Sequence, residues 1–135
     1  MLYLGSETKK MKKIINTHNA PKAIGPYSQA ILSGNTLYCS GQIATNPVNG
    51  KLVTDNITEE TNQVMQNILA VLNEAKMDFS HVVKCSIFMK DMNDYAAINA
   101  VYANSFLDNL PAREAVQVSA LPKNVNVEIS VIAEK

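Results

Sequence analysis

The sequence lacks tryptophan, has only two cysteines, and carries no excess charge of either sign. Its 12 Lys+Arg residues balance its 12 Asp+Glu residues, so no overall field favours nucleic acid or an anionic membrane surface. No apolar run approaches the roughly 20 residues that a membrane helix needs. These absences argue against nucleic acid and membrane as partners. The length of 135 residues, 47% of them hydrophobic, fits one domain with a core of its own.

Cysteine and histidine are too few and too scattered for a disulfide framework or a metal site. Cys39 and Cys85 lie far apart in apolar, strand-like segments, so we expect buried free thiols in a reducing compartment, the cytoplasm. His18 and His81 show no paired ligand spacing. We therefore expect no metal.

The first 13 residues lack the apolar core and small-residue cleavage site of a signal peptide. We expect a flexible extension over residues 1–13 and a single domain over residues 14–135.

Periodicity predicts an α+β fold. Apolar alternation indicates strands at residues 14–16, 27–32, 36–43, 82–89, 115–119 and 125–133. A period of 3.6 indicates helices at residues 58–76, which Asn56 or Thr58 could cap, and at residues 94–108. Two helices on one face of a mixed sheet leave the other face uncovered. Self-association is an economical cover for that face in a chain this short.

Two charged residues near the C-terminus suggest a site. Arg113 follows a proline, and its guanidinium could hold a carboxylate with two parallel hydrogen bonds. Glu128 interrupts an apolar strand pattern, where a held carboxylate could orient or deprotonate water. The alternatives are a surface ion pair for Arg113 and a solvated strand position for Glu128. Phosphate-loop, dinucleotide, zinc-protease and serine-hydrolase motifs are all absent, and no serine has an obvious histidine partner.

Four separated segments resemble the RidA (YjgF) family of reactive-intermediate deaminases. They are residues 19–28 (NAPKAIGPYS), 40–43 (SGQI), 83–94 (VKCSIFMKDMND) and 111–129, which runs from PAR to EI. The resemblance covers about residues 14–133. It implies a chorismate-mutase-like fold, a homotrimer with ligand clefts between subunits, and hydrolysis of 2-imino acids such as 2-iminobutanoate and 2-iminopropanoate. Such imines are already reactive, so we expect no cofactor.

The resemblance also assigns roles to residues. Arg113 matches the carboxylate-binding arginine, and Glu128 matches the water-positioning glutamate. The remaining matches line or border the cleft: Tyr27, Ser40, Gly41 and Asn99. The chain departs from the family pattern at Glu114, where a small residue is usual. Strand alternation predicts that Glu114 points away from Arg113.

Two other functions stay open. The family has also been called a ribonuclease or translation inhibitor, against which the balanced charge argues. A non-enzymatic module that binds small carboxylates would use the same cleft, but it would not require Glu128.

Overall fold

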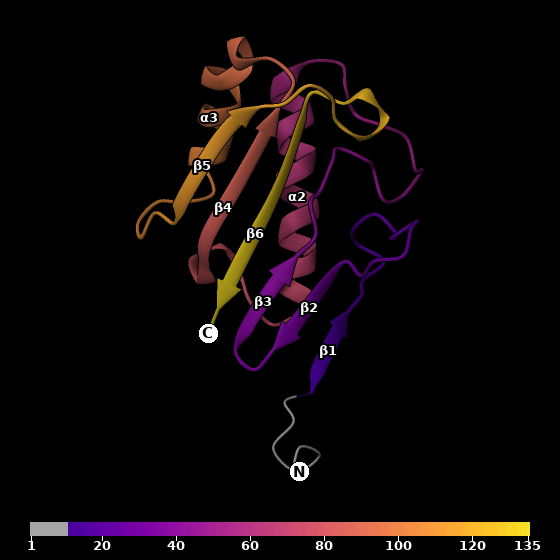
Figure 1. The fold of residues 1–135 in the computed structure, drawn as a ribbon, viewed down its shortest axis with the longest axis vertical. Helices are drawn as coiled ribbons and strands as arrows, with labels where there is room; N and C mark the ends of the chain where they lie inside the picture. Colours follow the sequence, from indigo (N-terminus) through magenta and orange to yellow (C-terminus); the bar gives the residue numbers. More distant parts are fainter. Residues whose placement is uncertain (1–10) are drawn as a thin grey trace, which may run out of the picture.

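The computed structural model describes residues 11–135 and contains a six-stranded sheet with two helices on one face (Figure 1). The helices are α2 (Ile57–Glu74) and α3 (Tyr95–Ala103), and three single turns accompany them: η1 (Phe79–His81), η2 (Met92–Asp94) and η3 (Pro122–Asn124). Across the sheet the strands run β1 (Lys12–Ile15), β2 (Ala30–Ser33), β3 (Thr36–Cys39), β6 (Val127–Glu134), β4 (Val82–Met89) and β5 (Ala112–Gln117). Of the five strand pairs within residues 11–135, β4–β5 is parallel and the other four are antiparallel. The expected α+β class with a mixed sheet is confirmed.

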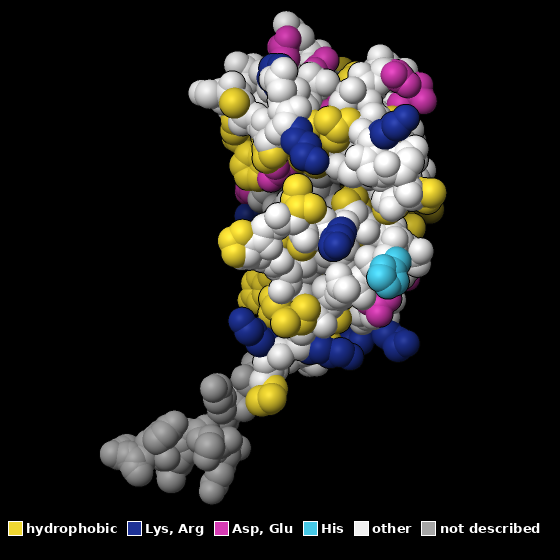
Figure 2. Space-filling view, turned by 90° about the vertical axis from the view of Figure 1, so that its right-hand side faces the viewer, with side chains coloured by type: hydrophobic (Ala, Val, Ile, Leu, Met, Phe, Trp, Pro, Cys, Tyr) yellow, Lys and Arg dark blue, Asp and Glu magenta, His cyan; other side chains and the backbone are white. Residues whose placement is uncertain are grey.

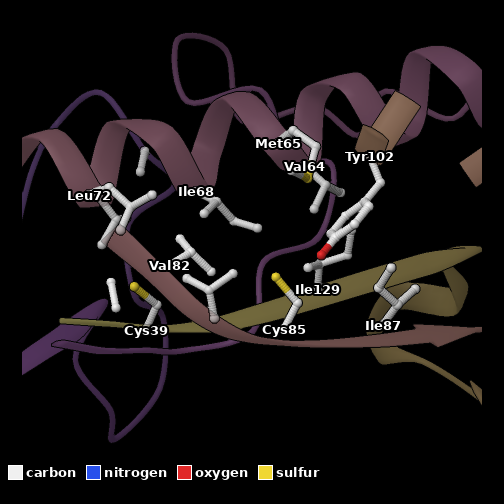
Figure 3. Packing of buried hydrophobic residues seen from close by; sticks show 14 of the residues in the cluster. Cys39, Val64, Met65, Ile68, Leu72, Val82, Cys85, Ile87, Tyr102 and Ile129 are labelled. Carbon is white, nitrogen blue, oxygen red and sulfur yellow. The ribbon is translucent and has the colours of Figure 1, made fainter. Parts of the chain in front are cut away.

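The core lies between α2 and the helix-side face of the sheet. Cys85 and Ile87 of β4 and Ile129 of β6 point toward Val64 and Ile68 of α2 (Figure 3). All five are at most 1% exposed. The alternation predicted for β6 is therefore confirmed, and that predicted for β4 holds at Cys85, Ile87 and Met89. It is wrong at Val83, expected on the buried side but 47% exposed, because a register irregularity between Val82 and Lys84 turns Val82 inward instead. Each strand gives every second side chain to this core and turns the others to the opposite face.

The opposite face of the sheet carries an apolar row with no cover from the described chain. The strand registers place Ile14, Ile31, Tyr38 and Ile132 side by side across β1, β2, β3 and β6. Ile14 is 62% exposed and Tyr38 is 50% exposed. Contiguous apolar surface of this kind is typical of an association surface.

Several element bounds differ from the predicted ones. β2 begins at Ala30 rather than residue 27, because the backbone turns tightly where Tyr27 N–H donates to the Gly25 carbonyl. β5 begins at Ala112 rather than residue 115, so Arg113 and Glu114 both lie in the strand. α3 ends at Ala103, five residues early. Asn56 is the cap of α2, since its side chain accepts from Glu59 N–H at 2.8 Å.

The N-terminal extension expected over residues 1–13 lies mostly outside the described residues. Lys12 and Lys13 belong to β1, which pairs with β2.

Candidate functional site

A pocket of about 670 Å³ brings together four of the predicted site residues: Tyr27, Ser40, Gly41 and Glu128. Its walls come from the loop between β1 and β2, the segment after β3, η3 and the start of β6. The volume falls in the range of small-molecule sites. The remaining two predicted residues, Arg113 and Asn99, do not line this pocket within the described chain.

The carboxylate of Glu128 is half-buried and forms no hydrogen bond or ion pair with another described residue. Glu128 lies opposite Phe88 on β4, so its side chain leaves the sheet on the face away from the helices. Burial raises the pKa of Glu128 above the usual value for glutamate. A carboxylate without a protein partner and with a raised pKa has the properties of a general base that binds water.

Gly41 shapes the space that Glu128 occupies. β3 ends at Cys39, and the chain rejoins the sheet at Gln42, whose backbone exchanges hydrogen bonds of 2.8 and 3.1 Å with Ile129. Between them, a Cβ atom added to Gly41 would lie 2.3 Å from Oε2 of Glu128. Real Cβ atoms do not approach so closely, so glycine is required for the observed carboxylate position.

For the imine hydrolysis that the sequence motifs imply, we predict that Gly41→Ala lowers the rate by about tenfold or more without unfolding the protein, because the added methyl displaces the Glu128 carboxylate. The assay is run beside a thermal unfolding curve. In a Glu128→Gln background the same change is expected to cost little more, since its effect passes through Glu128. Additive losses in the double variant would contradict this coupling.

Ser40 and Tyr27 contribute differently to the pocket. The Ser40 hydroxyl donates to the Ser28 carbonyl at 2.6 Å, so its proton is already used and its oxygen can only accept. Tyr27 is 53% exposed and lines the pocket. Ser40 thus ties two walls together, while Tyr27 offers contact surface to a ligand.

Three buried polar side chains, which the sequence prediction missed, hold the pocket walls. Gln29 bonds both backbone groups of Thr17 and the Pro21 carbonyl, at 2.7–3.1 Å. Asn67 donates to the carbonyls of Ile43 and Thr45 at 3.1 and 2.9 Å. Glu60 accepts from the backbone and side-chain nitrogens of Asn126 at 2.8 and 2.7 Å. Each anchors a loop that lines or adjoins the pocket.

A sequence signal for two of these residues existed. Glu60 and Asn67 fall at helical spacing from Val64 and Val71, on the apolar stripe of α2. A carboxylate or amide placed on a core-facing stripe needs a buried partner. That signal predicts a buried bond but does not say which loop receives it.

Arg113 lies on the helix-side face of the sheet, beneath α3. It pairs with Cys85 in the β4–β5 register, so its side chain shares the face of that buried residue. Nη1 donates to Asn99 Oδ1 at 2.7 Å, and Nη2 donates to the Tyr95 hydroxyl at 2.8 Å. The guanidinium carbon also lies 4.9 Å from the Tyr102 ring centroid. One N–H on each terminal nitrogen remains for a ligand.

Glu114 points away from Arg113, as strand alternation predicted. Its carboxylate pairs with Lys84 at 3.0 Å and accepts from the Ser86 hydroxyl. The Ser86 and Lys84 contacts lower the pKa of Glu114. The Glu114 carboxylate therefore does not pair with the Arg113 guanidinium.

The two charged residues of the expected mechanism lie on opposite faces of one sheet. Arg113 on β5 pairs with Cys85 of β4, and Glu128 on β6 pairs with Phe88 of β4. The two residues are therefore offset by three residues along β4, and β4 lies between their strands. Strand geometry separates the two backbones by about 10 Å along the strands and about 10 Å across them. A single chain cannot direct both groups at one small molecule.

Tyr95 is a further residue that sequence reasoning missed. We predict that Tyr95→Phe weakens binding of 2-keto acids by about threefold to tenfold and leaves kcat nearly unchanged, because it removes one hydrogen bond that orients Arg113. Calorimetry with 2-oxobutanoate measures it. Tyr102→Phe is the matched control, since the Tyr102 ring lies 4.9 Å from the same guanidinium carbon while its hydroxyl has no oxygen or nitrogen partner in residues 11–135. Equal effects of both changes would contradict the prediction.

Residues 11–135 contain no group of three or more His, Cys, Asp or Glu side chains arranged to hold a metal ion. In the same residues, no helix is both long and apolar enough to cross a membrane.

The chain matches known proteins over nearly its whole length. The family model described as Endoribonuclease L-PSP matches residues 17–135. A RutC family protein of Pyrococcus horikoshii is 50% identical over 93% of this chain and 99% of that protein. The 2-iminobutanoate/2-iminopropanoate deaminase of Capra hircus is 47% identical over 91% of this chain and 90% of that protein. The crystal structure of E. coli TdcF with bound serine superposes with a TM-score of 0.88 at 36% identity, covering 91% of this chain and 98% of that one.

The mixed sheet with two helices on one face is thus the L-PSP/YjgF fold. The chain belongs to the Endoribonuclease L-PSP family, the RidA (YjgF) family that its sequence motifs resemble.

Proposed function

We propose that this chain hydrolyses 2-imino acids, such as 2-iminobutanoate and 2-iminopropanoate, to 2-keto acids and ammonia. The observation that carries the proposal is the half-buried carboxylate of Glu128, which has no partner among the described residues and lines a pocket of small-molecule size. The 47% identity to the Capra hircus deaminase supports the same chemistry.

The residue types suit each step of this reaction. The free N–H pair of Arg113 binds the substrate carboxylate and fixes the adjacent C=N carbon. Glu128 holds a water against that carbon and takes a proton as the C–O bond forms. That proton passes to the nitrogen and gives the carbinolamine. Glu128 then takes the proton of the carbinolamine hydroxyl and returns it to the nitrogen, so that the C–N bond breaks as the C=O bond forms. Water is consumed, ammonia leaves and no oxidant or reductant is needed.

We further propose that the chain works as a homotrimer, in which Arg113 of one subunit meets Glu128 of the next. The separation of these residues on opposite sheet faces within one chain supports this arrangement. The uncovered row of Ile14, Ile31, Tyr38 and Ile132 supports burial of that face between copies. Head-to-tail contacts that close into a ring would repeat the site at each interface.

The direct test of the activity generates 2-iminobutanoate in place from an amino acid and an oxidase, and follows its decay. The protein is expected to accelerate the decay above the spontaneous rate, and Glu128→Gln is expected to return it close to that rate. Decay at the spontaneous rate in the presence of folded wild-type protein would reject the proposal.

The activity is expected to fall on the acid side at a higher pH than an ordinary glutamate would give. Only ionised Glu128 can accept the proton from water, and burial raises its pKa, so the base is lost earlier as pH decreases. A profile of kcat against pH measures this limb. A limb within the usual range of glutamate, or one that persists in Glu128→Gln, would assign it to another group.

Two other functions are weighed against this one. Cleavage of RNA, suggested by the family description, requires an attractive surface that a net charge of zero does not supply. A binding module is supported by the serine bound to TdcF, but binding alone gives no role to an unpartnered Glu128. We also propose a cytoplasmic location, because Cys39 and Cys85 are buried free thiols.

A further inference from the structure

The pocket contains two lysines that the proposed reaction does not use. Lys22 lies in the loop between β1 and β2, Lys123 lies in η3, and both line the pocket that contains Glu128. Within residues 11–135, neither ammonium group forms an ion pair or hydrogen bond with another side chain. Figure 2 shows one face of the molecule, on which lysine and arginine side chains lie among hydrophobic ones.

The backbone segments that carry the two lysines are held in place. Lys123 adopts φ 54° and ψ 23°, and Asn124 after it adopts φ 57°, an unfavourable left-handed pair for residues other than glycine. The Asn124 side chain accepts from Lys90 Nζ at 2.6 Å. Lys22 follows Pro21, whose carbonyl accepts from the buried Gln29 at 2.8 Å. Both lysines therefore extend from fixed positions on the pocket wall.

The charges of the pocket exceed what a monocarboxylate needs. Among the described residues that line it, Glu128 is the single acid beside the two lysines. In the proposed reaction, Arg113 of a neighbouring subunit already neutralises the carboxylate next to the imine.

We propose that the site takes 2-imino acids whose side chain ends in a second carboxylate, which Lys22 and Lys123 bind. This inference rests on the proposed function and names its substrate class. Such imines are formed by two-electron oxidation of acidic amino acids, and their hydrolysis consumes water and releases ammonia in the same way. Two ammonium groups across an open pocket attract a terminal carboxylate and orient it away from Glu128.

The test compares two keto acids of equal chain length, 2-oxoglutarate and 2-oxopentanoate, by calorimetry at pH 7.5 and low salt. Wild-type protein is expected to bind 2-oxoglutarate about tenfold more tightly, the scale of two exposed ion pairs. The Lys22→Met, Lys123→Met double variant is expected to bind both acids equally. Lys51→Met, which removes a neighbouring lysine outside the pocket lining, is expected to keep the preference.

Three other results would overturn either the inference about the second carboxylate or the proposed function. Equal affinity of the two acids for wild-type protein would overturn the inference and leave the proposed function standing. Equal weakening of both acids in the double variant would show that the lysines bind the first carboxylate, and would overturn it as well. Absence of binding by either acid, with no acceleration of imine decay, would reject the proposed function itself. Unfolding curves of both variants accompany the titrations.

Discussion

Glu128→Gln is expected to lower kcat for imine hydrolysis by about 10²-fold or more, the usual scale for loss of a general base. Binding of 2-oxobutanoate is expected to change little, because no proton is transferred to Glu128 in that complex. Paired measurements of imine decay and calorimetric affinity separate the two effects. Full activity in a folded variant would show that Glu128 has no catalytic role and would favour the hypothesis of a module that binds small carboxylates.

Stability provides an internal control for this variant. Burial raises the pKa of Glu128, so the folded state binds its proton more tightly than the unfolded chain does. As pH rises from the pKa of Glu128 in the unfolded chain to its pKa in the folded protein, ionisation of Glu128 lowers the free energy of unfolding. Glutamine carries no charge, and the variant is therefore expected to unfold at the same temperature at neutral pH or at a higher one. A lower unfolding temperature would indicate damage to the fold.

Arg113→Met is expected to lower kcat/KM by about 10²-fold, since it removes two hydrogen bonds from a charged donor to the substrate carboxylate. Unlike Glu128→Gln, it is expected to weaken 2-oxobutanoate binding as strongly as it slows turnover. Arg113→Lys keeps the charge but loses the two-pronged geometry, so about a tenfold loss is expected. Undiminished binding of the keto acid by Arg113→Met would contradict the role given to this arginine.

The sequence predicted the strands that bury one face completely. β4 and β6 alternate because every second residue meets α2, and that alternation placed Glu128 on the opposite face correctly. β5 was misplaced because it is an edge strand with no fully buried side chain, so no apolar alternation marks its start. The predicted strand therefore began at residue 115, three residues later than β5 does.

The separation of Arg113 and Glu128 depends on strand register, which local pattern does not contain. β5 pairs with β4 in parallel and β6 pairs with β4 in antiparallel fashion, and these two registers fix the faces of both residues. Likewise, the glycine at position 41 is readable from sequence, but its contact with Glu128 follows from β3 and β6 lying side by side.

The most direct test of the account mixes two inactive variants, Arg113→Met and Glu128→Gln, by refolding them together in equal amounts. In a closed ring of head-to-tail contacts, about a quarter of the interfaces then join an intact Arg113 to an intact Glu128. We expect about a quarter of wild-type activity, against about a hundredth for either variant alone. Activity that stays at the level of the parents, in mixtures shown by mass to contain mixed oligomers, would contradict a site shared between subunits.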